Sequence, residues 1–240
     1  MFEKEKAKLS TDGLYLKRYG KEKRNNKELV TIAVTQNGWA LEYADPEMQD
    51  DKNIVLKAVS QRGRTLEFAS PRLRDDKEVV LKAVAQSGCA LQFASDELRN
   101  NKSVVLKAVD RNGYALQYAN LELRCDKDVA LKAVENVGGA LQYAGRKLKS
   151  DREVVLAAVS QNGDALRYAN DELQGDKEVV LKAVDQYGLA LRYADREMRN
   201  DKEVVLKAVN ECGFAINYAS LELRNDKDVY AALANAKRML

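Results

Sequence analysis

The spacing of the glycines constrains the fold of this 240-residue chain more than any other feature. Eight glycines follow one another at intervals of 25 residues: Gly38, Gly63, Gly88, Gly113, Gly138, Gly163, Gly188 and Gly213. A fixed period of about 20 to 50 residues is typical of repeat proteins, in which each unit buries its apolar face only against its neighbours. The sequence therefore predicts one continuous repeat array.

One unit contains three predicted helical segments. With Asp76 as position 1, a unit reads DKEVVLKAVAQSGCALQFASDELRN and ends at Asn100. Apolar residues at positions 4, 5, 6, 8 and 9 cover about 200° of a helix and predict a long helix over 76–87 that contacts two neighbours. A short helix over 89–94 follows. Pro at position 21 in two units then marks the start of a single helical turn.

The helix ends carry capping signals. We expect position 25, such as Asp75, to cap the long helix, and Glu78 to complete a capping box. Gly88 stands where a left-handed C-cap residue would end that helix, which gives a physical reason for its recurrence.

The predicted fold is all-α: an α-solenoid of eight 25-residue helical repeats with N- and C-terminal capping units. Residues 1–25 form a degenerate N-terminal cap, residues 26–225 the eight repeats, and residues 226–240 a C-terminal capping helix. In this last segment Arg238 falls where a glycine would be due. Ala at position 8 of every repeat interrupts the alternation that a β-strand would need.

Composition excludes several classes of function. The chain has 40 basic and 37 acidic residues, so its net charge of +3 offers no strong field for a polyanion, and nucleic acid is an unlikely partner. It has no histidine, which removes the commonest general base and most zinc sites. The sequence therefore predicts no enzyme, with no catalytic residue, cofactor or metal site.

The chain also lacks the signals of membrane insertion or secretion. No apolar run approaches the roughly 18 residues of a membrane helix, and the charged start MFEKEKAKLS is unlike a signal peptide. The three cysteines stand at different places in the repeat and are expected to be free thiols. We predict a cytoplasmic protein without membrane contact, with secretion as an effector as an alternative.

Two repeated features have structural explanations. Glu at position 3 and Lys at position 7, such as Glu78 and Lys82, are expected to form i,i+4 pairs on a solvated helix face. The Tyr or Phe at position 18, such as Tyr168 or Phe93, resembles a track for stacking bases. Because Phe replaces Tyr in two repeats, we interpret this row as core packing.

Two positions vary between repeats while the rest stay constant. Position 14 reads Trp39, Arg64, Cys89, Tyr114, Gly139, Asp164, Leu189 and Phe214. Position 17 reads Glu42, Glu67, Gln92, Gln117, Gln142, Arg167, Arg192 and Asn217. Three residues apart on a helix, these two positions share one face. Large apolar residues occupy position 14 in four of the eight repeats, where a core does not require them.

These rows form the predicted partner-binding surface. Its candidate residues are Trp39, Glu42, Arg64, Tyr114, Asp164, Arg167, Leu189, Arg192 and Phe214. Exposed aromatic side chains are the usual anchors of an interface. The alternatives are drift at a loosely constrained position, or packing of position 14 against the next repeat.

The recurrent text DKEVVLKAV, followed by G-x-AL-x-YA and ELR, resembles the tandem repeats catalogued as domain of unknown function 4116. The resemblance extends over about residues 26–229 and implies a helical repeat array without a catalytic motif. Some relatives in this family look like secreted effectors of intracellular bacteria. The chain departs from the pattern at Thr31, Ile32, Thr65, Ala157 and in the unit that contains Gly139 and Gly145, where we expect local changes of packing only.

The predicted function is that of a non-catalytic scaffold that binds a protein or peptide partner, which the sequence does not identify. The alternative is binding of single-stranded nucleic acid with one base per repeat, as in helical-repeat RNA readers. The sequence makes no prediction of the oligomeric state.

Overall fold

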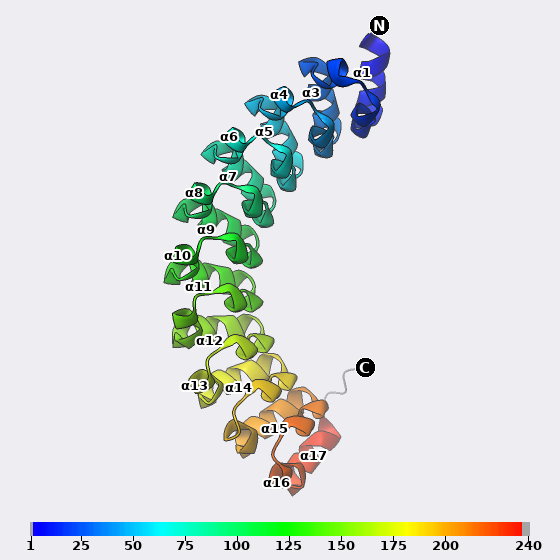
Figure 1. The fold of residues 1–240 in the computed structure, drawn as a ribbon. Coiled ribbons are helices and arrows are strands. Elements are labelled where there is room, and N and C mark those ends of the chain that lie inside the picture. The colour runs from blue at the N-terminus through cyan, green and yellow to red at the C-terminus, as the bar shows by residue number, and fades with distance from the viewer. Residues whose placement is uncertain (1, 237–240) are drawn as a thin grey trace. The chain divides into compact units, whose positions relative to one another are not determined.

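The computed structural model describes residues 2–236, and within that range the chain contains helices and no strand (Figure 1). It divides into two compact units, Met1–Leu123 and Arg124–Leu240. An all-α repeat was predicted, and the same three kinds of helix indeed recur in order along both units. Arg238 lies outside the described residues.

The three kinds of helix have the following bounds. The long helices are α1 (Phe2–Thr11), α3 (Lys27–Gln36), α5 (Lys52–Gln61), α7 (Lys77–Gln86), α9 (Lys102–Arg111), α11 (Lys127–Asn136), α12 (Arg152–Gln161), α14 (Lys177–Gln186), α15 (Lys202–Glu211) and α17 (Lys227–Asn235). The 3₁₀ helices that begin at a glycine are η1 (Gly13–Arg18), η2 (Gly38–Tyr43), η3 (Gly63–Phe68), η4 (Gly88–Phe93), η5 (Gly113–Tyr118), η6 (Gly138–Tyr143), η8 (Gly163–Tyr168), η9 (Gly188–Tyr193) and η11 (Gly213–Tyr218). The short third segments are α2 (Lys21–Arg24), α4 (Pro46–Gln49), α6 (Pro71–Arg74), α8 (Asp96–Arg99), α10 (Leu121–Arg124), η7 (Arg146–Ser150), α13 (Asp171–Gln174), η10 (Met198–Asn200) and α16 (Leu221–Arg224).

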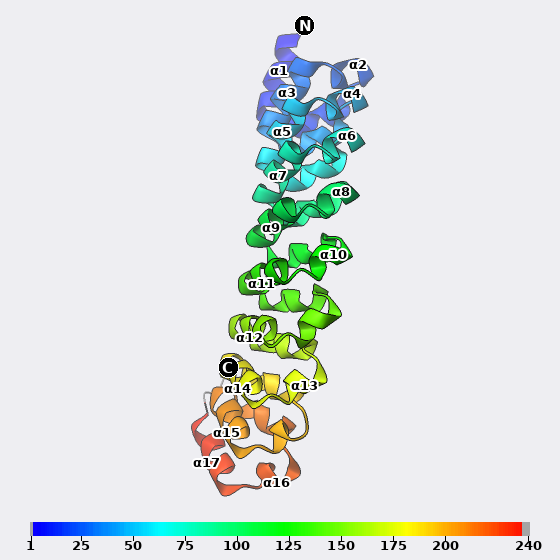
Figure 2. The same ribbon diagram turned by 90° about the vertical axis from the view of Figure 1, so that its left-hand side faces the viewer.

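The long helices pack side by side within each unit (Figure 2). In the first unit, α1, α3, α5, α7 and α9 each contact the next in that order, and in the second unit α11, α12, α14, α15 and α17 do the same. Positions 4, 5, 8 and 9 are fully buried in the inner helices, as Val79, Val80, Ala83 and Val84 show. Leu81, at position 6, is only half-buried, so the buried arc is narrower than the apolar arc of the sequence.

The predicted N-cap was wrong by one residue. The side chain of Asp76 accepts hydrogen bonds from the backbone N–H groups of Glu78 and Val79, at 3.0 and 3.2 Å. Asp76 has an extended backbone, so its carboxylate reaches the first free amides of α7. The carboxylate of Asp75 instead accepts a hydrogen bond from the hydroxyl of Ser95 in the following short segment.

The reason predicted for the glycines was also wrong. No glycine among residues 2–236 has a positive φ, so none serves as a left-handed C-cap. The long helix ends at an extended residue, such as Ser87, and the glycine begins the following 3₁₀ helix. A Cβ atom on Gly38 would lie 2.7 Å from the carbonyl oxygen of Ala58 in the next long helix. The glycines therefore permit a close approach between neighbouring layers.

Polar contacts tie each layer to the next. The amide N–H of Gly38 donates to Oε1 of Gln61 at 3.0 Å, across the same close approach. On the other side of the layer, the N–H of Ser95 donates to the carbonyl of Arg74 at 2.9 Å, and equivalent bonds recur in both units. Several of the 3₁₀ helices and short segments in each unit are thus held by hydrogen bonds to a neighbouring layer.

The charged residues of the long helices pair between layers. Lys52 lies 2.7 Å from Asp76 and 2.8 Å from Glu78. The same pattern joins Lys127 to Asp151 at 2.8 Å. The predicted i,i+4 partner of Glu78 was therefore wrong, because its carboxylate pairs with Lys52 of the preceding layer. Such exposed pairs contribute little stability individually, on the order of 0.2–1 kcal/mol.

Candidate functional site

The 3₁₀ helices present positions 14 and 17 at the protein surface. A 3₁₀ helix has about three residues per turn, so side chains three apart lie directly above one another. In η2 the intervening Ala40 and Leu41 are fully buried, whereas Glu42 is exposed and Trp39 is half-buried. The rows predicted from the sequence therefore share a surface, although their members differ in exposure.

In the first unit, Trp39 does not stand free in solvent. Its ring meets that of Phe68 edge to face, with centroids 6.0 Å apart, and so packs against the following layer. This is the alternative that the sequence left open for position 14. Arg64 is exposed beside it, and Tyr114 exposes 38% of its surface.

Two further residues of the first unit show the effect of burial and contact. Burial raises the pKa of the Cys89 thiol, and Asn112 Nδ2 lies 3.3 Å from its sulfur. Hydrogen bonding with Glu42 raises the pKa of Tyr43. Neither arrangement activates a nucleophile, because a raised thiol pKa lowers the fraction of thiolate.

In the second unit, position 14 covers the full range of exposure. Gly139 is buried and Leu189 is half-buried. Phe214 exposes 66% of its surface, compared with 38% for Tyr114 in the first unit. The large apolar residues of the row therefore divide into two that are partly covered and two that face solvent.

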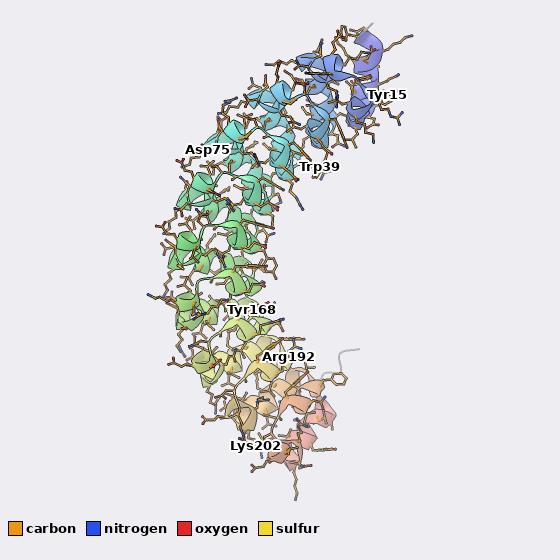
Figure 3. The ribbon with its side chains drawn as sticks, in the orientation of Figure 1. Tyr15, Trp39, Asp75, Tyr168, Arg192 and Lys202 are labelled. Carbon is orange, nitrogen blue, oxygen red and sulfur yellow. The ribbon has the colours of Figure 1, made fainter. Side chains whose placement is uncertain are left out.

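The charged members of the second unit form one cluster. Asp164 lies 3.3 Å from Arg167 on the same 3₁₀ helix and 3.0 Å from Arg192 on the next. The guanidinium of Arg167 lies over the rings of Tyr168 and Tyr193, and that of Arg192 lies 4.5 Å from the centroid of Tyr193. Figure 3 shows Tyr168 and Arg192 on the same side of this unit, with Lys202 on the other.

Burial and charge shift the ionisation of this cluster. Burial is the main cause that raises the pKa of Tyr193, and the nearby charge of Asp164 adds to it. The hydrogen bond to Asp164 raises the pKa of Arg167. Both arginines stay protonated, so the cluster carries two positive charges and one negative charge in neutral solution.

The tyrosine and phenylalanine row is half-buried rather than part of the core as predicted. Side chains at positions 14 and 17 cover three of these rings: Trp39 packs on Phe68, and arginines lie over Tyr168 and Tyr193. Sequence reasoning missed the stacking of arginines on Tyr193. The signal in the sequence was the pair of opposite charges at Asp164, in position 14, and Arg192, in position 17 of the next repeat.

Sequence reasoning also missed a second set of exposed apolar residues. Leu121 and Leu221 stand at position 21, at the start of α10 and α16, and expose 69% and 76% of their surface. They belong to the row of short segments and not to the rows at positions 14 and 17 (Figure 1).

Residues 2–236 offer neither a metal site nor a membrane span. No three His, Cys, Asp or Glu side chains in that range lie together as the ligands of a metal ion would. A bilayer-spanning helix needs about 20 apolar residues. None of the helices in the same range combines the length and the apolar character to cross a membrane.

The repeats match a known family. The family model described as "Domain of unknown function (DUF4116)" matches residues 26–74, 76–124, 126–174 and 176–224, which together make up most of the chain. The chain belongs to the DUF4116 family. Each DUF4116 match contains two of the glycines that recur every 25 residues, as Gly88 and Gly113 do in residues 76–124. No curated protein and no solved structure matches the chain.

The family assignment confirms the resemblance found in the sequence. The description of DUF4116 names no activity, so a function for this chain must be argued from its own surface.

Proposed function

We propose that this DUF4116 chain is a non-catalytic scaffold that binds a protein or peptide partner through positions 14 and 17. In this proposal the chain is an α-solenoid of eight 25-residue repeats between two capping units. The serial packing of the long helices within each unit supports such an array. The contacts from the recurring glycines to the next long helix give the stack its regular spacing.

The observation that carries the proposal is the exposure of Tyr114 and Phe214. The neighbours of Tyr114 on η5, Ala115 and Leu116, are fully buried and anchor this helix to the core. Complete burial of a Phe side chain is worth roughly 1.5–3 kcal/mol, and most of the surface of Phe214 forgoes this in the chain alone. Exposed aromatic residues on a rigid surface are typical of interface anchors.

Trp39 and Leu189 contribute differently to the proposed surface. Because Trp39 packs on Phe68, its ring is fixed before any partner arrives. Ordering a mobile side chain on binding costs about 0.5–1.5 kcal/mol in rotamer entropy, and a side chain that is already ordered loses little of this. The half-buried members thus shape the surface, and Tyr114 and Phe214 supply the area that a partner would bury.

The chemistry of the chain also supports a binding role. The sequence has no histidine, so acid–base chemistry near neutral pH would depend on other groups with strongly shifted pKa values. The three cysteines are free, which fits the cytoplasmic location that the proposal assumes.

The proposal is tested by affinity capture from native lysate with three forms of the protein. The test variant carries Tyr114→Ala and Phe214→Ala. The control variant carries Leu121→Ala and Leu221→Ala, which removes apolar side chains that are even more exposed, from a different row. A protein recovered by the wild type and the control but not by the test variant is the expected result.

Two outcomes count against the proposal. Equal recovery with all three forms would mean that the variation at position 14 is drift. Recovery that disappears after nuclease treatment would favour single-stranded nucleic acid as the ligand. Melting temperatures of the variants close to that of the wild type show that any loss does not arise from unfolding.

A further inference from the structure

Arg167 and Arg192 converge on Asp164 in the second unit. Their guanidinium groups reach it from two successive 3₁₀ helices, η8 and η9, at 3.3 and 3.0 Å. The side chains of Arg167, Arg192 and Asp164 keep 45%, 34% and 30% of their surface exposed. The cluster is therefore ordered by its own contacts and still open to solvent.

One carboxylate does not satisfy two guanidinium groups. Each guanidinium carries about five N–H donors, whereas a carboxylate accepts about four hydrogen bonds in total. The two contacts to Asp164 come from Nη1 of Arg167 and Nη2 of Arg192, one nitrogen from each. The cluster thus retains an excess positive charge and donors that a second oxyanion can accept.

Both guanidinium groups lie over tyrosine rings, which restricts their movement. Arg167 lies 5.1 Å from the ring centroid of Tyr168 and 5.6 Å from that of Tyr193, and Arg192 lies 4.5 Å from the centroid of Tyr193. Guanidinium groups held in this way lose little freedom when they bind a carboxylate in their plane. The aromatic rings at position 18, which recur in every repeat as Tyr or Phe, therefore position the variable arginines.

The surroundings favour a single carboxylate in a peptide over a polyanion. Leu189 lies one turn from Arg192 on η9 and is half-buried, so an apolar surface adjoins the charge. The other residues at positions 14 and 17 of this unit are uncharged: Gly139, Gln142, Leu189, Phe214 and Asn217. A nucleic acid would need several neutralised phosphates along its track, and this row provides one excess cation.

We propose that the Asp164, Arg167 and Arg192 cluster binds the side-chain carboxylate of an acidic residue in the peptide partner, with an adjacent apolar residue of that peptide on Leu189. This inference rests on the proposed function and names the chemistry of the partner at one point of its surface. Asp164 bridges the two arginines, and the ligand carboxylate completes the charge balance.

The inference is tested by NMR titration of the isotope-labelled full chain, with the arginine Nε–H signals as the readout. The probe is the peptide acetyl-Gly-Ser-Glu-Leu-Glu-Ser-Gly-amide, and the matched control peptide has Gln in place of both Glu residues. The Nε–H signals of Arg167 and Arg192 are expected to shift with the Glu peptide and to stay in place with the Gln peptide. Arg192→Gln is expected to weaken binding by about tenfold or more, since a hydrogen bond to a charged group is lost.

Arg196→Gln provides the control variant, because it removes the same charge from an exposed site in the same unit outside the cluster. It is expected to bind the Glu peptide like the wild type. Equal shifts with both peptides, or undiminished binding by Arg192→Gln, would overturn the inference.

The outcome is separable from that of the proposed function. If the peptide fails to shift the arginine signals while capture still depends on Tyr114 and Phe214, this inference fails and the scaffold proposal stands. If the arginines respond to the Glu peptide while capture is unaffected by Tyr114→Ala and Phe214→Ala, the carboxylate site is supported and the anchoring role proposed for Tyr114 and Phe214 fails.

Discussion

The close approach at the repeating glycines predicts a specific loss of stability for Gly38→Ala. The new Cβ would lie 2.7 Å from the carbonyl oxygen of Ala58, about 0.7 Å closer than the 3.4 Å at which ordinary contact begins. The atom that it meets is backbone, so α5 must move away from η2. The movement also lengthens the 3.0 Å hydrogen bond from Gly38 N–H to Gln61.

The expected cost follows from two opposing effects. Overpacking of a tight contact costs about 1–3 kcal/mol. Alanine also restricts the unfolded chain, which favours folding by about 0.4–1 kcal/mol where the backbone angles suit it. Gly38→Ala is therefore expected to lower the free energy of unfolding by about 1–2 kcal/mol, measured as a lower urea midpoint by circular dichroism.

Two variants distinguish the close approach from a left-handed backbone. Gly20→Ala is the control, since no atom lies within 4 Å of the added Cβ, and its stability should change by about 0.5 kcal/mol at most. Gly38→Asn should be at least as unstable as Gly38→Ala, because its side chain is larger. Asparagine tolerates the left-handed conformation better than alanine does. A Gly38→Asn protein more stable than Gly38→Ala, or a wild-type midpoint for Gly38→Ala, would refute the steric explanation.

Individual contacts lead to three further predictions. Asp151→Ala should lower the free energy of unfolding in urea by about 1 kcal/mol, because it removes the N-cap of α12. Asp151→Asn should retain most of that stability, since asparagine caps the equivalent helix in two other repeats. Equal losses would show that the ion pair with Lys127, and not the cap, stabilises this helix end. The hydrogen bond from Lys127 is the main cause that lowers the pKa of Asp151 below its ordinary value. The stability that this bond contributes is therefore complete above the unfolded pKa of about 3.9 and is lost as the pH falls through the lower folded pKa. Acid should accordingly destabilise the wild type more than Asp151→Asn, and parallel curves of urea midpoint against pH for the two proteins would contradict this. A thiol reagent should label exposed Cys125 fastest and buried Cys212 slowest in the folded protein, with equal rates only in denaturant; rapid native labelling of Cys212 would mean that the last repeat opens readily.

Much of the helical structure was predictable because the signals are local. The apolar arc of residues such as Val79 and Val80 depends only on the rotation of about 100° per residue within one helix. Gly88 lies at the change from the long helix to the short one, although its backbone conformation is not the one expected. The predicted boundaries of these two helices are therefore correct within a residue or two. The recurrence of the same text every 25 residues is likewise enough to indicate the family.

The candidate surface was predictable in part. Positions 14 and 17 share a face because three residues make about one turn, which again is local. The exposure of each member was not predictable, since Trp39 is covered by Phe68 from the next repeat and Phe214 is not covered in this way.

The sequence by itself determined the period, the helical class and most of the positions that face the core, such as Val79, Val80, Ala83 and Val84, because these depend on residues within a few turns of one another. Only the tertiary structure decided why glycine recurs, which cation Glu78 meets and how Arg192 reaches Asp164. Each of these contacts joins residues roughly one repeat apart. Their geometry depends on the distance and rotation between packed layers. These follow from the close packing of backbone and side chains between layers, and the sequence pattern of a single helix does not reveal them.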